Sequence, residues 1–134
     1  MSLLTDLGTY LNSASISTQD LTLGTNLFLS RMPESPDTCV ALIQSGGTAP
    51  TDTFGTSFPI LETPGIQTLV RSASYATGES LAVDVFKSLQ SVENQTLTST
   101  LYLKIEAEQS PFPVERDTQE RVVFSCNFLI TEAT

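Results

Sequence analysis

Histidine and tryptophan are absent from this sequence of 134 residues. Without histidine, a Ser-His or Cys-His nucleophile cannot be assembled, so the common hydrolase arrangements are excluded. The phosphate-binding patterns GxxxxGK and GxGxxG are also missing. Catalysis would have to depend on carboxylates alone, and the two that share a predicted strand face, Glu106 and Glu108, are typical of a solvated surface. We therefore predict that the chain is not an enzyme and uses no cofactor.

Basic residues are few, since six Lys and Arg stand against fifteen Asp and Glu, giving a formal net charge of -9. A protein that wraps nucleic acid needs clustered Lys and Arg to neutralise phosphates, and here they are scattered. No apolar run approaches the roughly 20 residues of a membrane helix. The first residues lack the basic segment of a secretion signal. We expect a cytosolic protein without membrane contact.

Only two cysteines occur, Cys39 and Cys126, and they are far apart in the sequence. Neither belongs to a CxxC pair, and no histidine is present to complete a zinc site. Each lies in an alternating apolar stretch, where a free cysteine behaves as a small buried hydrophobe. No DxD cluster offers carboxylates to a divalent cation. We therefore predict two reduced core thiols and no metal site.

The first part of the chain predicts one helix and two strands. Apolar residues recur at helical spacing over residues 3–13, and a polar loop follows over 13–25. A short apolar run at 26–31 indicates a strand, which ends at the two prolines of segment 32–37. The nearly continuous apolar run at 38–44 favours a strand covered on both faces.

The Gly46-Gly47 pair is expected to end that strand and to lead into a long loop over residues 48–65. Long loops in compact domains are usually functional, and this one carries large apolar side chains. They are candidates for a subunit or partner interface, and folding back over the edge of their own sheet is an equal alternative. The candidate interface residues are Phe54, Phe58, Ile60 and Leu61, together with Phe112 between two prolines.

A strand at 66–72 and a second helix over 75–92 follow, with Ser74 as the expected N-cap of the helix. The helix carries one apolar stripe, and its charged residues lie away from that stripe. Residues 94–96 match a glycosylation pattern, but without a secretion signal they are interpreted as a loop.

Two alternating strands are predicted at 101–108 and 122–130, with a polar connection between them. In the first strand the odd positions are apolar, and in the second the even positions are. These two strands follow each other closely and should pair antiparallel. The predicted fold is one domain over residues 1–134. It is a two-layer α+β domain with a mostly antiparallel sheet of four to five strands and two helices on one face.

Several collinear pieces of the sequence resemble the minor capsid protein family of phages. Residues 26–47 contain an apolar strand, a Met-Pro-x-Ser-Pro-Asp turn, a second strand and a Gly-Gly pair. The strand at 66–71 and the helix start at 75–78 are also similar to family patterns. The Gln-x-Pro turn at 109–112 and the final strand at 121–128 complete the resemblance, which spans most of the chain.

Such proteins are similar to the tail terminators of long-tailed phages. The resemblance implies a homo-oligomeric ring, a hexamer, that caps the tail tube and joins it to the head-completion proteins in the neck of the virion. It also implies an α+β fold, in agreement with the fold predicted from the spacing of the apolar residues. Genomic DNA would pass through the lumen of the ring without specific binding. Carboxylates facing the lumen would repel phosphates, and Glu106 and Glu108 are our candidates for that role.

Three alternatives remain open at the level of the sequence. A head-completion or connector subunit shares the size and ring habit of a terminator. A small ligand-binding domain, or a carboxylate-dependent enzyme, would require a concave pocket with convergent polar groups. An adhesin-like module is suggested by the Ser and Thr content, although two amphipathic helices argue against a pure β-sandwich.

Overall fold

The computed structural model describes residues 3–13, 20–52, 60–98 and 100–133, and for residues 48–52 and 60 it describes the backbone alone. These residues form two helices and seven strands. They are α1 (Leu3–Ser13), β1 (Leu27–Leu29), β2 (Cys39–Asp52), β3 (Ile60–Ser72), α2 (Tyr75–Gln90), β4 (Glu93–Leu97), β5 (Thr100–Ala107), β6 (Phe112–Arg116) and β7 (Val122–Ala133).

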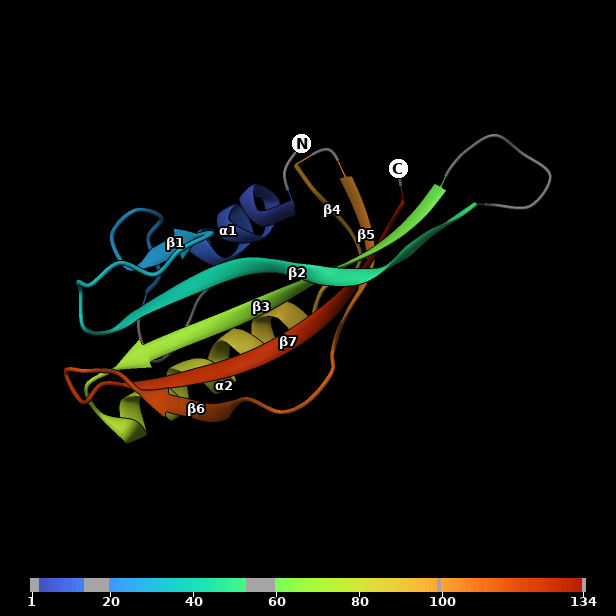
Figure 1. Ribbon diagram of the computed structural model, residues 1–134. Helices are drawn as coiled ribbons and strands as arrows, with labels where there is room; N and C mark the ends of the chain where they lie inside the picture. The colour runs from blue at the N-terminus through green and yellow to red at the C-terminus, as the bar shows by residue number, and fades with distance from the viewer. Residues whose placement is uncertain (1–2, 14–19, 53–59, 99, 134) are drawn as a thin grey trace.

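All seven strands belong to one sheet, in which six follow the order β1-β2-β3-β7-β5-β4 (Figure 1). The pairing of β1 with β2 is parallel, and the other pairings are antiparallel. Strand β7 is central, because β3 pairs with one of its edges while β6 and β5 share the other. The predicted α+β class is confirmed. The sheet itself is mixed and larger than the four or five mostly antiparallel strands that we expected.

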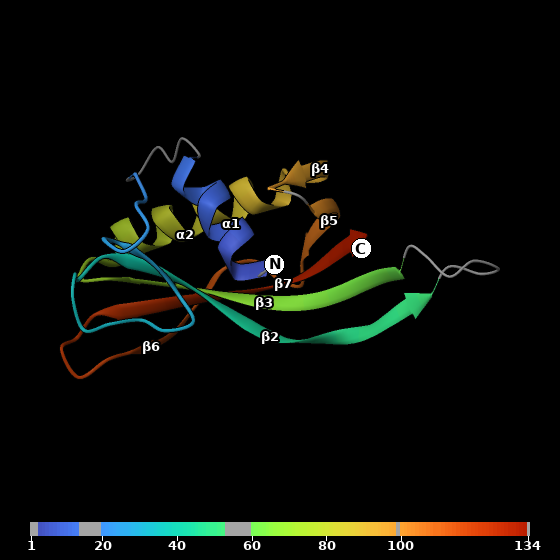
Figure 2. The same ribbon diagram turned by 90° about the horizontal axis from the view of Figure 1, so that it is seen from above.

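Both helices lie on the same side of the sheet, as expected, and the side chains between the two layers form the core (Figure 2). Alternation along β3 and β7 sends every second side chain to this side, and the helices supply their apolar stripes. Full burial of one Leu or Phe side chain stabilises the fold by about 1.5–3 kcal/mol. Fully buried core residues include Leu7, Leu11, Ile66, Leu81, Leu89, Phe124 and Phe128.

Helix α2 begins where the sequence predicts. The Ser74 side chain accepts a hydrogen bond from the backbone N–H of Thr77 at 3.4 Å, which confirms the N-cap. In the first turn, Gly78 packs against the ring of Phe124, and a Cβ there would lie 2.9 Å from a ring carbon. Glycine is therefore what allows the helix to approach the sheet so closely. The helix ends at Gln90, two residues before the predicted end.

The expected loop over residues 48–65 is wrong at both ends, because β2 and β3 continue through most of it as a long hairpin. Gly46 and Gly47 do not end β2 but lie in it. The register with β3 shifts between Ser45 and Gly47, and Gly47 adopts a φ of 92°. A Cβ at Gly47 would collide with the carbonyl oxygen of Thr63. The glycines thus form a β-bulge, which bends the hairpin without interrupting it.

Two further strands were missed, and in a third the predicted alternation fails at its first two predicted residues. Residues 94–96 belong to β4 rather than to a loop, and β6 forms within the polar connection before β7. In β5 the register shifts between Tyr102 and Lys104. That shift buries Tyr102 completely and leaves Leu101 38% exposed, so the odd positions do not all face the core. Ile105 is buried as predicted.

The second alternating strand, β7, follows its predicted pattern: Val122, Phe124, Cys126, Phe128 and Ile130 are all buried on the helix side. Both cysteines are free and buried, as predicted. β7 pairs antiparallel with β5, which confirms the expected pairing of the last two predicted strands.

Candidate assembly surfaces

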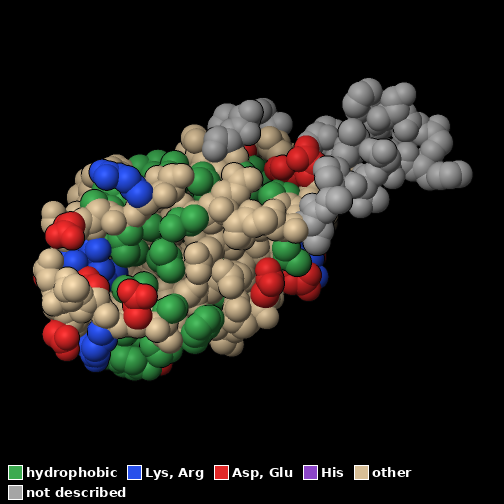
Figure 3. Space-filling view, in the orientation of Figure 1, with side chains coloured by type: hydrophobic (Ala, Val, Ile, Leu, Met, Phe, Trp, Pro, Cys, Tyr) green, Lys and Arg blue, Asp and Glu red, His purple; other side chains and the backbone are tan. Residues whose placement is uncertain are grey.

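The side of the sheet opposite the helices carries apolar side chains that are only half covered. Residues that pair directly across strands point to the same side, so Ile43, Gln67 and Asn127 share this face. Their neighbours Leu69 and Leu129 are also half-buried there. Figure 3, in the same orientation as Figure 1, shows hydrophobic side chains gathered over the sheet, with charged groups near its ends. We call this side the outer face.

One end of the outer face is covered by residues 31–38, which form the crossing segment between β1 and β2. The guanidinium of Arg71, only 5% exposed, donates to the carbonyl oxygens of Pro36 at 2.6 Å and Asp37 at 3.3 Å. Arg121, 4% exposed, donates to the carbonyl oxygen of Glu34 at 2.6 Å. Two buried arginines therefore hold the crossing segment against the sheet.

Arg121 also makes two ion pairs, with Asp117 at 2.7 Å and Asp37 at 3.2 Å. The backbone N–H of Arg121, and then its side chain, hold the pKa of Asp117 below its usual range. Arg71 differs, because among the described residues it makes no ion pair within 4.0 Å. Within this part of the chain, the hydrogen bonds of its side chain go to backbone carbonyl oxygens.

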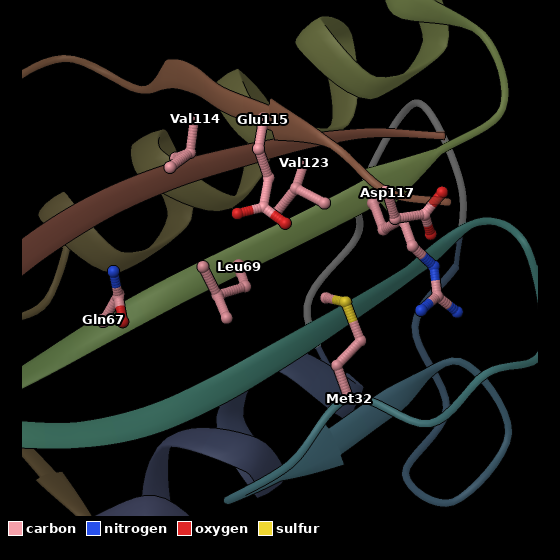
Figure 4. Close-up of a pocket in the computed structure, with 8 residues that line it drawn as sticks. Met32, Gln67, Leu69, Val114, Glu115, Asp117 and Val123 are labelled. Carbon is pink, nitrogen blue, oxygen red and sulfur yellow. The ribbon is translucent and has the colours of Figure 1, made fainter. Parts of the chain in front are cut away.

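Between the crossing segment and β6 lies a hollow of about 390 Å³, which we call the outer groove (Figure 4). Leu69 of β3 and Val123 of β7 form its floor, Met32 forms one wall, and Val114 the other. Polar groups stand around this apolar centre. The full lining is Met32, Gln67, Leu69, Arg71, Val114, Glu115, Asp117 and Val123.

Strand β6 is an edge strand whose side chains are all exposed. Phe112 is 42% exposed and Val114 is 50% exposed, which is unusual for large apolar residues on a folded domain. A second hollow, of about 260 Å³, lies against β6 and is lined by Tyr75, Pro113 and Val114 among others. Phe112, a predicted interface candidate, is thus available to a partner.

Of the other predicted interface residues, Ile60 and Leu61 belong to the far end of the β2–β3 hairpin. Phe54 and Phe58 lie outside the described residues. Ile60 is the first residue of β3, and Leu61 is half-buried opposite Thr51 and Ala133. The hairpin continues beyond the end of β7, since its outermost pairing joins Asp52 to Ile60. Ile60 and Leu61 therefore belong to a strand rather than to the expected loop, and their role at an interface stays a prediction.

The two acidic candidates for a lumen lie near the end of β5. Glu106 is exposed and forms an ion pair with the equally exposed Lys104 at 3.5 Å. Glu108 is exposed just after β5, where its backbone N–H donates to the carbonyl oxygen of Asn127. Burial, followed by the charge of Glu108, raises the pKa of the Cys126 thiol to about 11, so this cysteine remains protonated.

Sequence reasoning missed a second acidic group on the helix side. Glu62 of β3 and Glu132 of β7 are direct cross-strand partners. Burial and then the charge of Glu62 raise the pKa of Glu132. Nearby, the Tyr102 hydroxyl donates to Asp6 Oδ2 at 2.6 Å, while Asp6 Oδ1 is buried with no hydrogen-bond partner among the described residues. Alternation could have placed Glu62 and Glu132 on the core side, but only the register makes them neighbours.

The described residues contain no group of three or more His, Cys, Asp or Glu side chains placed to bind a metal ion. In the same part of the chain, no helix is long and apolar enough to cross a membrane.

The buried arginines were also missed by sequence reasoning. The available signal was a lone arginine beside each of two apolar strands, Arg71 near the end of β3 and Arg121 just before β7.

This fold is shared with a component of a virion. The chain is similar to a solved structure described as the virion of a native gene transfer agent (GTA) particle, with a TM-score of 0.74. The match covers 99% of this chain and 96% of that chain. At 14% sequence identity it shows the fold alone.

The family is defined by the sequence itself. Residues 10–133 match the family described as bacteriophage tail terminator protein, and the chain belongs to that family of structural phage proteins. The predicted resemblance is therefore confirmed. A comparison with curated proteins finds no match.

Proposed function

We propose that this protein caps the tail tube of a phage as a closed ring and joins the tube to the head-completion proteins in the neck. The observation that carries the proposal is the family match over residues 10–133. The likeness of the whole fold to a chain of a virion particle supports it. Assembly would take place in the host cytoplasm, and the finished ring would remain in the virion.

A closed ring requires two different patches on each subunit that complement each other. The end of the hairpin, with Phe54, Phe58, Ile60 and Leu61, is one proposed patch. Phe112 belongs to the other, because it is exposed on an edge strand beside two hollows. We take six copies as the expected number, on the basis of the family resemblance.

The lumen of such a ring must let DNA pass without holding it. A formal net charge of -9 per subunit favours this, since carboxylates repel phosphates. We propose Glu106 and Glu108 as lumen residues because both are exposed near one end of the sheet. Lys104 reduces the contribution of Glu106 through its ion pair, so Glu108 is the stronger source of repulsion.

Mixing the purified protein with purified tail tubes tests the proposal. Negatively stained class averages should show tube ends closed by a ring, and native mass spectrometry should give a closed number of copies. Tubes that stay open while the protein binds head-completion proteins would reassign it as a connector subunit. A protein that binds neither tubes nor head-side proteins would refute a role in the neck.

A further inference from the structure

The outer groove and the end of the hairpin lie at opposite ends of the same strand. Val123 of β7 forms the floor of the groove, whereas Ala133 of β7 pairs with Leu61 of the hairpin. Ten residues separate Val123 from Ala133, so the two sites lie roughly 30 Å apart at about 3.3 Å per residue. Moreover, the hairpin continues away from the groove, because its outermost pairing lies beyond the end of β7.

We propose that the segment 53–59 at the end of one copy's hairpin docks into the outer groove of a second copy. The inference deepens the proposed ring and rests on that function. Separation along β7 keeps the two surfaces apart within one chain, so a second copy must bring them together. A contact between two different surfaces of identical chains is head-to-tail, which is the geometry that rings require.

The chemistry of the groove fits the sequence of that segment. The segment reads Thr-Phe-Gly-Thr-Ser-Phe-Pro, with two aromatic side chains and no charge. Aromatic side chains buried in a partner's pocket are the usual anchors of protein interfaces. The groove offers about 390 Å³ with an apolar floor of Leu69 and Val123 and apolar walls of Met32 and Val114. That volume lies at the lower end of the range for ligand pockets, which suits one or two side chains.

The charged groups around the groove are compatible with an uncharged occupant. The segment itself carries no charge, Asp52 directly precedes it, and Glu62 follows three residues after its end. Arg71 lines the groove together with the carboxylates of Glu115 and Asp117, so groups of both signs surround its apolar floor. An uncharged segment can enter without placing a like charge beside either carboxylate. Glu115 on the opposite wall would disfavour an acidic segment entering from the other side.

Cysteine crosslinking tests the contact directly. One preparation carries Phe58→Cys and a second carries Val114→Cys, and the two are mixed under mild oxidation. Native Cys39 and Cys126 are buried and therefore do not compete. We expect a disulfide-linked dimer in a yield roughly tenfold above that of a control pair, because docking raises the local thiol concentration. The control pairs Phe58→Cys with Thr96→Cys, which is exposed on the other edge of the sheet.

A mixing experiment tests the head-to-tail geometry. The groove variant is Val114→Glu, and the tip variant combines Phe54→Ser with Phe58→Ser. Each should fail to form rings alone, while Thr96→Glu, with the same added charge elsewhere, should form them. A mixture of the groove and tip variants keeps one intact groove and one intact segment per pair. It should therefore yield one-to-one dimers and no rings.

The outcomes separate this contact from the proposed function. No dimer, or equal dimer with the control pair, would overturn the contact even if the wild-type protein caps tail tubes. A selective dimer from a protein that leaves tubes open would keep the contact and remove the function. Rings formed by the mixed variants would also overturn the head-to-tail arrangement, since neither variant would then depend on its missing surface.

Discussion

The two faces of the sheet are made from the same strands, but they differ in how they are covered. On the helix side, Ile66, Val70 and Phe128 are at most 1% exposed beneath α1 and α2. On the outer face, their neighbours Gln67, Leu69 and Leu129 are half-buried, and the crossing segment and β6 lie beside an open groove. One face therefore holds the subunit together, while the other has apolar surface left for a partner.

Replacing Phe128 by Ala should have the largest effect on this comparison. The ring is fully buried and lies 6.3 Å from the ring of Phe86, measured between centroids. Removing it leaves a cavity, so the free energy of unfolding should fall by about 3–5 kcal/mol. Leu129→Ala, one residue along β7 on the outer face, should cost about 1 kcal/mol. Urea unfolding of both variants measures the difference, and equal losses would contradict the distinction between the faces.

Arg71→Gln should give the next largest effect, this time on the outer face. The substitution removes charged hydrogen bonds to the carbonyl oxygens of Pro36 and Asp37, which should lower the free energy of unfolding by about 2 kcal/mol. Arg116→Gln is the matched control, since Arg116 is exposed and should change stability by less than about 0.5 kcal/mol. Hydrogen exchange should also show faster exchange in the crossing segment. Unchanged exchange there would mean that Arg71 does not anchor it.

Tyr102→Phe tests the polar pair enclosed on the helix side. Asp6 Oδ2 would lose the 2.6 Å hydrogen bond from Tyr102, and Oδ1 already lacks a hydrogen-bond partner in the described part of the chain. A buried carboxylate without partners is unfavourable, so the free energy of unfolding should fall by about 1–2 kcal/mol. Tyr10→Phe is the control. It removes the partly buried hydrogen bond from the Tyr10 hydroxyl to the carbonyl oxygen of Ser88, and it should lower the free energy of unfolding by about 0.5 kcal/mol. If the double variant Tyr102→Phe with Asp6→Asn is no more stable than Tyr102→Phe alone, the unpaired carboxylate is not the cause of the lost stability.

Glu62→Gln should produce the smallest change, and it should be a gain. Like charges directly opposite each other destabilise a sheet, so removing one should stabilise the fold by about 0.2–1 kcal/mol at pH 7. The pKa of Glu132 is raised in the folded state, which means that its ionisation destabilises the fold as the pH rises. The gain should therefore disappear below the ordinary glutamate pKa of about 4.3.

Thermal unfolding at pH 7 and at pH 3.5, roughly below that ordinary value, tests this sign. Glu79→Gln on the exposed side of α2 serves as the control, because it removes the same charge away from Glu132. A gain of equal size in both variants would assign the effect to the net charge of the protein.

The elements that the sequence predicted well are those whose own side chains reveal their environment. Both helices and the buried face of β7 repeat their apolar residues at the spacing of the structure that they form. The Ser74 cap is similarly local. By contrast, β4 and β6 are edge strands held by backbone hydrogen bonds, and their polar residues and prolines resemble those of loops.

The surfaces were harder to predict than the elements. Phe112 and Leu61 were identified as apolar residues in polar surroundings, and the structure shows one exposed and the other half-buried near the hairpin's end. The outer groove, between β6 and the crossing segment, depends on strand register, which no local sequence pattern reveals. Arg71 lines it only because β3 pairs with β2 and β7 in one particular alignment.

Strand β7 has a consequence for the order in which the chain folds. Its three partners, β3, β5 and β6, all precede it in the sequence, and the pairing of Ser72 with Val122 closes a span of fifty residues. The β2–β3 hairpin needs no such closure and can form from neighbouring residues alone. Folding should therefore begin at the hairpin and finish when β7 enters between β3 and β5. The floor of the outer groove does not exist before that last step, so immature chains cannot receive a neighbour's hairpin.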